Sequence, residues 1–138
     1  MAQPHFTSIN AFLEGVNLCV AFKEAGLGNN QLITYILSAN ATAEYACIYK
    51  GAQYPQASNK EAVSVAVSTT ATLKSDKNGK VINTICLSPG SPTDLSCPPG
   101  KQLVLVSVTY NVVTLTDTIN QISIGVSGNF SDTFVDLV

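Results

Sequence analysis

The chain has 138 residues and a net charge of −2, and only 12% of its residues are charged. All seven basic residues are lysine, so the chain lacks the arginine that reads guanine, and its net charge opposes binding to phosphate; nucleic acid is therefore excluded as a partner. One histidine leaves little material for a histidine-based metal site, and no run of about 18 apolar residues is present to span a membrane.

Length and composition together predict one folded domain over residues 1–138, with residues 1–5 as a flexible N-terminal segment. Domains commonly contain about 100–150 residues, and a hydrophobic fraction of 46% is sufficient for a core. Turn signals recur along the chain and separate runs of roughly 6–15 residues. This spacing predicts an antiparallel β-sandwich, immunoglobulin-like or jelly-roll-like, with about 7–9 strands.

Residues 10–25 have two interpretations. Asn10 and Gly26 have the character of a helix N-cap and a helix stop, which allows one helix between them. The alternative is two strands, 6–13 and 16–24, joined at a tight turn. Two strands are preferred because the rest of the chain is so uniformly β.

Residues 31–49 are predicted to form a long strand, although its alanine-rich centre weakens the strand propensity. Tyr35, Tyr45 and Tyr49 share one face of this strand with alternate apolar residues. The core is the favoured location for that face. If the face is open to solvent instead, these rings are candidate contacts for a ligand or partner, because tyrosine combines a flat apolar body with a polar tip.

Residues 63–74 alternate strictly between the two faces of a strand and are rich in valine and threonine. Asn78-Gly79 follows, and this dipeptide is favoured in the type I′ turn of a β-hairpin. Residues 81–87 are therefore predicted as the return strand of a hairpin. Further along, residues 102–115 are apolar enough to predict a central strand covered on both faces, and segments 121–126 and 129–135 complete the chain.

The chain contains no residue pattern that indicates an enzyme, a metal site or a cofactor. His5 is the sole imidazole, the acidic residues are scattered, and the Gly-x-Ser-x-Gly elbow of many hydrolases is absent. Asp76-Lys77-Asn78-Gly79 is similar to the start of a calcium loop, but that loop would need a bidentate glutamate where Leu87 stands. We therefore assign no catalytic, cofactor or metal residue and predict that the protein is not an enzyme.

The loop around Gly26 and Gly28 is a weaker candidate for binding. Its glycines and asparagines suit positive φ angles, which is a purely conformational explanation. The alternative is a ligand-binding loop with Asn29 and Asn30 as contacts. Two N-glycosylation sequons, at Asn40 and Asn129, carry meaning only in a eukaryotic producer.

Several segments resemble a group of small secreted microbial proteins that carries no established activity. The segments are residues 21–31, with Lys-Glu-Ala-Gly-Leu-Gly-Asn-Asn, and 43–47, 97–103, with Cys-Pro-Pro-Gly, 108–110 and 115–118. The resemblance covers nearly the whole chain. It implies an extracellular protein whose signal peptide has been removed, with a β-sandwich-like domain, and it offers no catalytic residues to carry over.

The four cysteines favour disulfides, since they are even in number and other metal ligands are few. Spacing alone allows three pairings, and a Cys86–Cys97 bridge around the Pro/Gly loop is as natural as the others. The resemblance implies a different set, with Cys47 paired to Cys97 and an additional bridge between Cys19 and Cys86.

These observations predict a secreted, non-enzymatic structural or interaction protein. Its partner would be a second copy, in a homo-oligomer joined by strand edges or by exchange of terminal segments 2–13 and 128–138, or else an extracellular surface. The alternative is a lectin-like module that binds a glycan or another small ligand.

Overall fold

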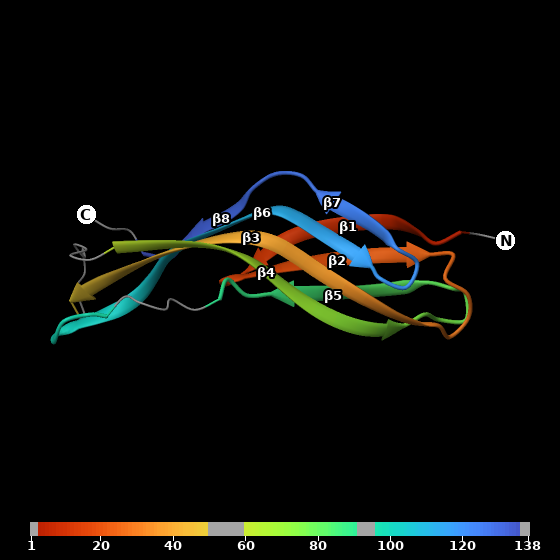
Figure 1. The fold of residues 1–138 in the computed structure, drawn as a ribbon, viewed down its shortest axis with the longest axis horizontal. Coiled ribbons are helices and arrows are strands. Elements are labelled where there is room, and N and C mark those ends of the chain that lie inside the picture. The colour runs from red at the N-terminus through yellow and green to blue at the C-terminus, as the bar shows by residue number, and fades with distance from the viewer. Residues whose placement is uncertain (1–2, 50–59, 91–95, 136–138) are drawn as a thin grey trace.

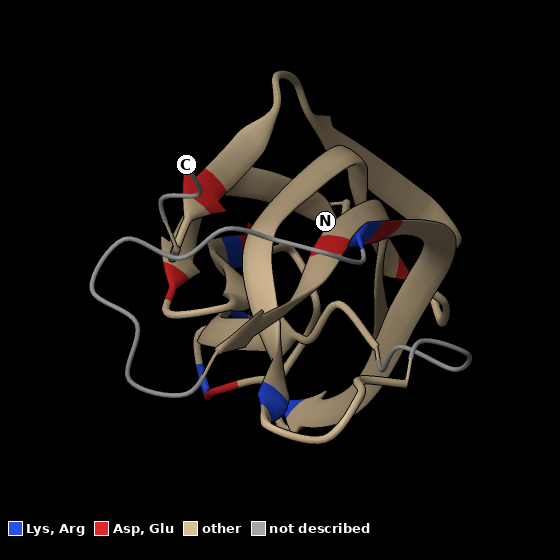
Figure 2. Ribbon diagram, turned by 90° about the vertical axis from the view of Figure 1, so that its left-hand side faces the viewer, with Lys and Arg blue, Asp and Glu red and all other residues tan. Residues whose placement is uncertain are grey.

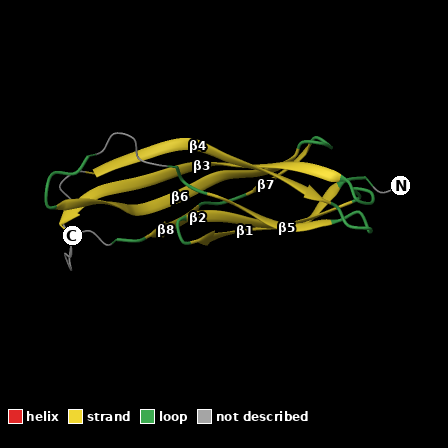
Figure 3. Cartoon of the chain, turned by 90° about the horizontal axis from the view of Figure 1, so that it is seen from below, coloured by secondary structure: helices red, strands yellow, loops and turns green. Residues whose placement is uncertain are grey.

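The structure is a computed structural model that describes residues 3–49, 60–90 and 96–135. Within these residues the chain forms two antiparallel sheets packed face to face (Figures 1 and 3). This confirms the predicted all-β sandwich of 7–9 strands. The eight strands are β1 (His5–Glu14), β2 (Asn17–Ala25), β3 (Leu32–Tyr49), β4 (Lys60–Lys74), β5 (Val81–Leu87), β6 (Lys101–Asp117), β7 (Ile122–Val126) and β8 (Phe130–Thr133).

The smaller sheet has the order β1-β2-β5, and the larger has the order β4-β3-β6-β7, with β8 also paired to β6. Strands β7 and β8 share the same edge of β6, where β7 pairs with residues 113–117 and β8 with residues 107–110. Strands β3, β4 and β6 are the longest and extend past one end of the smaller sheet (Figure 1). The described residues include no helix with the length and apolar character needed to cross a membrane.

The two-strand interpretation of residues 10–25 is confirmed. β1 and β2 pair antiparallel from His5 opposite Ala25 to Glu14 opposite Asn17. Gly15 supplies the positive φ of 60° that the short connection needs. A helix would have turned Leu18, Val20 and other inward-facing side chains of β2 away from the core.

The core lies between the sheets and follows the two-residue period of the strands. Ile33, Tyr35, Leu37, Ala39, Ala41 and further odd-numbered residues of β3 are buried, together with inward residues of β2, β5 and β6. β6 is central, as its apolar sequence predicts. Only its inner face is covered by the other sheet, because Thr109, Thr114 and Thr116 on its outer face are half-exposed.

The predicted hairpin between residues 63–74 and 81–87 is wrong. Both strands exist, but β4 pairs with β3 and β5 pairs with β2, so residues 75–80 cross from one sheet to the other. A type I′ turn needs positive φ at both central residues, and only Gly79 of the pair has it. The Asp76 carboxylate instead accepts the backbone N–H groups of Asn78 and Lys80, and the Gly79 N–H donates to the Asp76 carbonyl oxygen, so residues 76–80 form a different tight turn.

Both disulfides implied by the resemblance are present. Cys19 and Cys86 face each other in the register of β2 and β5, with Cα atoms 4.0 Å apart. Cys47 in β3 is joined to Cys97, just before β6, with Cα atoms 5.5 Å apart. Two disulfides fit an oxidising, extracellular environment.

Candidate functional site

β4 is the edge strand of the larger sheet, and it pairs only with β3 among the described residues. Its residues 62–73 contain neither a charged side chain nor a proline. Charge and proline are the usual means by which proteins protect a free strand edge from pairing with another chain. Val65, in the middle of this stretch, is 42% exposed. Among the residues that the structure describes, no strand other than β3 pairs with β4, so its second edge presents a long row of backbone groups.

The other edges are shorter or better protected. β5 has seven residues, β7 has five and β8 has four, with Asp132 inside β8. β1 pairs with β2 on one side and packs beside β7 and β8. The sparse charges are separated by long uncharged stretches of ribbon (Figure 2). β4 is consequently the edge best suited to pairing with a second chain.

The outer face of the larger sheet carries several hydroxyl groups and few charges, among them Glu44. The hydroxyl oxygens of Thr34 in β3 and Thr72 in β4 are hydrogen-bonded at 3.0 Å. Those of Thr42 and Ser64, on the same two strands, are hydrogen-bonded at 2.9 Å. Such cross-strand pairs stabilise a sheet by about 0.2–1 kcal/mol each. They also give the face hydrogen-bonding capacity without net charge.

Three buried polar side chains meet where β2, β3 and β6 come together. Tyr35 donates a hydrogen bond of 2.6 Å from its hydroxyl to Oε1 of Glu24, and both residues are fully buried. Asp117, the register partner of Tyr35, is also fully buried. Phe6 of β1 and Val81 of β5 flank Glu24 in the smaller sheet and bring no charge.

The two carboxyl groups have different surroundings. Asp117 accepts hydrogen bonds from the backbone N–H groups of Ile119 and Asn120 and from the side-chain amide of Asn120. Oε2 of Glu24 receives no hydrogen bond from the described residues. Burial and the neighbouring Asp117 carboxyl raise the pKa of Glu24 to about 8, although the bond from Tyr35 opposes this. Glu24 therefore keeps its proton at neutral pH.

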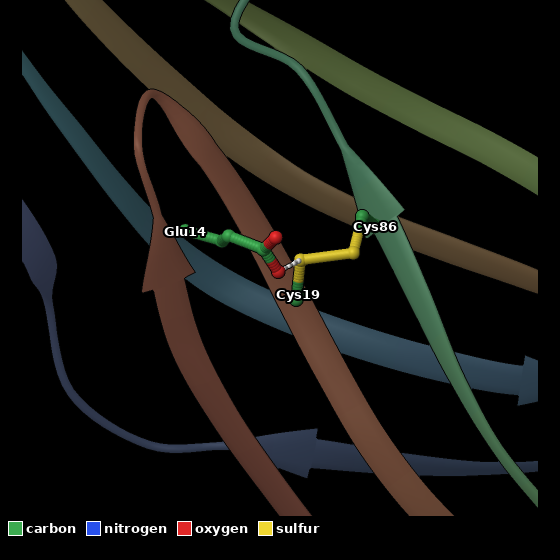
Figure 4. Close-up of side chains that lie close together, drawn as sticks. All are labelled: Glu14, Cys19 and Cys86. Atoms are coloured by element: carbon green, nitrogen blue, oxygen red, sulfur yellow. Dashed lines mark hydrogen bonds between the residues drawn. A yellow bond between two sulfur atoms is a disulfide. The ribbon is translucent and has the colours of Figure 1, made fainter.

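Glu14, Cys19 and Cys86 lie close together near the end of β1 (Figure 4). Both sulfur atoms belong to the disulfide, so neither is the thiolate that binds a metal. A disulfide sulfur also carries no proton, and the 3.7 Å approach of Cys19 Sγ to Oε2 of Glu14 is therefore a contact without a hydrogen bond. The cluster does not fit a metal ion.

The tyrosine candidates separate into two groups. Tyr35 and Tyr45 are buried in the core, the favoured location for their shared face. Burial and Glu24 raise the pKa of Tyr35, and burial raises that of Tyr45. Tyr49 is 60% exposed, and the Lys101 ammonium lies 4.5 Å from the centre of its ring. Of these three tyrosines, Tyr49 alone has a ring that is exposed to a partner.

The loop and sequon asparagines are exposed. Asn29 and Asn30 follow the two loop glycines, and Asn30 has a positive φ of 55°. Asn40 lies on the outer face of β3, and Asn129 lies in the turn between β7 and β8. Segment 2–13 contains β1 except its last residue, and segment 128–138 contains β8, while residues 2 and 136–138 lie outside the described residues.

Comparisons with protein families, with curated proteins and with solved structures found no match for this chain. Function is therefore inferred from its own residues and their geometry.

Proposed function

We propose that the protein is a secreted, non-enzymatic structural or interaction protein that associates with copies of itself through the open edge of β4. The observation that carries this proposal is the run of twelve uncharged residues, 62–73, along a strand edge that no other described strand pairs with. The two disulfides support an extracellular setting. The small number of candidate catalytic groups supports a non-enzymatic role.

Self-association would extend the larger sheet from one molecule into the next. Backbone N–H and C=O groups on the free edge of β4 would pair with the same groups of a second β4, antiparallel to the first. The isologous contact has two-fold symmetry and therefore closes as a dimer. The half-exposed Val65 would be covered in this arrangement, which adds apolar burial to the hydrogen bonds.

A charge on the edge tests the proposal. Val65→Lys places an ammonium group at the contact, where pairing would bury it without a partner. Size-exclusion chromatography with light scattering should show an oligomer for the unchanged protein and a monomer of 14.5 kDa for this variant.

Leu32→Lys is the matched control, because Leu32 is 65% exposed but lies at the start of β3, away from the free edge. It should leave the oligomer intact. An unchanged protein that stays monomeric over a wide concentration range would refute self-association. Equal loss of the oligomer in both variants would refute the assignment of the interface to β4.

A further inference from the structure

A hollow of about 670 Å³ lies at one end of the sandwich, among the connections between strands. The β2–β3 loop, the turn at 76–79, Asn120 and the segment around Pro4 and His5 all contribute to its wall. A volume of this size is typical of small-ligand sites. The hollow is separate from the free edge of β4.

The loops around this hollow are held by buried polar residues. Among the described residues, the buried polar or charged side chains are Glu24, Ser75 and Asp117, and each lies beside one of these connections. The Ser75 hydroxyl donates to the carbonyl oxygen of Gly28 at 2.7 Å and accepts the N–H of Gln31 at 2.8 Å. Asp117 fixes the β6–β7 turn in the same manner. Burying a polar group costs desolvation free energy unless hydrogen bonds compensate it. The concentration of such hydrogen-bonded groups at one end therefore indicates that the conformations of these loops are fixed.

Two of the loops are in direct backbone contact. The N–H of Leu27 donates to the carbonyl oxygen of Gly79 at 3.0 Å. A Cβ atom at Gly79 would lie 3.0 Å from the nitrogen of Gly28, so glycine is needed for this approach. The wall of the hollow is therefore preorganised, which reduces the entropy lost when a ligand binds.

The polar groups around the hollow define its chemistry. Lys77 supplies a positive charge, and neither aspartate nor glutamate is among the described lining residues. His5 has its Nδ1 2.7 Å from the carbonyl oxygen of Gln3, so Nδ1 is the donor in this contact. Asn29 and Asn78 add carboxamides, each of which has donors and an acceptor for hydroxyl groups.

We propose that this hollow binds a small acidic saccharide, with Lys77 contacting the carboxylate and the asparagines contacting hydroxyl groups. Pro4 and Leu27 provide apolar wall against which the carbon face of a sugar ring would pack. The site thus involves Asn29 and not the tyrosine face of β3. It is independent of the association through β4.

Titration with D-glucuronate, followed by backbone amide NMR shifts, tests the proposal. The shifts should be confined to the amides around the hollow, at His5, residues 25–29, residues 77–79 and Asn120, and D-glucose, which lacks the carboxylate, should produce much weaker ones. Lys77→Gln should weaken glucuronate binding about tenfold, because a charge-assisted hydrogen bond is lost.

Lys80→Gln is the matched control: it removes the same charge from the same connection, but Lys80 does not line the hollow. Its affinity for glucuronate should equal that of the unchanged protein, and so should that of the Val65→Lys variant. Absence of shifts with glucuronate, equal binding of glucose, or equal loss in both lysine variants would overturn the proposal.

Discussion

The hydroxyl of Tyr35 donates a 2.6 Å hydrogen bond to Oε1 of Glu24 inside the core, between strands of opposite sheets. This bond satisfies one carboxyl oxygen of Glu24 and leaves the other beside Asp117, with no hydrogen bond to it from the described residues. Two buried carboxylates side by side repel each other, so one of them holds a proton. The surroundings identify Glu24 as that residue.

The proton on Glu24 makes stability depend on pH. The pKa of Glu24 is about 8 in the folded protein and close to its ordinary value in the unfolded chain. Between roughly pH 5 and 8 the unfolded chain has lost this proton and the folded protein has kept it. The free energy of unfolding therefore falls as pH rises through this window, by at most about 1.4 kcal/mol per pH unit.

Glu24→Gln removes this contribution, because glutamine is neutral at every pH and can still accept the bond from Tyr35. Urea unfolding between pH 5 and 9 should show a shallower pH dependence for the variant and a higher free energy of unfolding above pH 8. Glu44→Gln, on the outer face of β3, should retain the dependence of the unchanged protein. An identical pH dependence in the Glu24 variant would contradict the assignment.

Each disulfide should contribute strongly to stability. The bridges span 67 and 50 residues of chain, and closing loops of this length stabilises a protein by about 4 kcal/mol through the unfolded state. Replacing either cysteine pair by alanine should lower the free energy of unfolding by about that amount. Denaturant unfolding measures the change, and peptide mapping without reductant checks the pairing. A mapped Cys86–Cys97 peptide would contradict it.

Val112 has a φ of 52°, which is unfavourable for a β-branched residue. It lies in a bulge where β6 inserts an extra residue between the partners of Ser38 and Asn40. Its side chain is 68% exposed, so little burial is lost on replacement. Val112→Asn should therefore raise the free energy of unfolding by about 1 kcal/mol, because asparagine tolerates this conformation.

Leu32→Asn is the control for this change, since Leu32 is similarly exposed but lies in regular strand. Asparagine has a low strand propensity, so this variant should be no more stable than the unchanged protein in urea unfolding. The strain at Val112 would be disproved if both variants had the same stability.

The period of two in the sequence was sufficient to predict β3 and β4, because each sheet has one buried face, whereas residues 10–25 also allowed a helix. It also explains why the core face of β3 could be identified. Strand pairing was harder: residues 63–74 and 81–87 are adjacent in the chain, and the Asn-Gly between them favours a hairpin. Their separation into two sheets depends on contacts with β2 and β3, which local sequence does not encode.

The candidate sites depended even more on distant contacts. The lack of charge in residues 62–73 is visible in the sequence, but the free edge follows from the order of the strands. Glu24 shares the inward period of Val20 and Phe22, a signal that marks it as buried. Its proximity to Asp117, far along the chain, required the fold.

The N-terminal segment approaches Gly26 closely, and substitution of this glycine tests that contact. A Cβ atom at Gly26 would lie 2.2 Å from the carbonyl oxygen of Gln3, and the φ of Gly26 is 77°. Gly15 has a similar φ of 60° but open space around it, so Gly15→Ala measures the conformational cost alone, about 1–2 kcal/mol. Gly26→Ala should cost more, because the chain at Gln3 must also move. Equal losses of unfolding free energy in the two variants would show that this segment does not pack against Gly26 in solution.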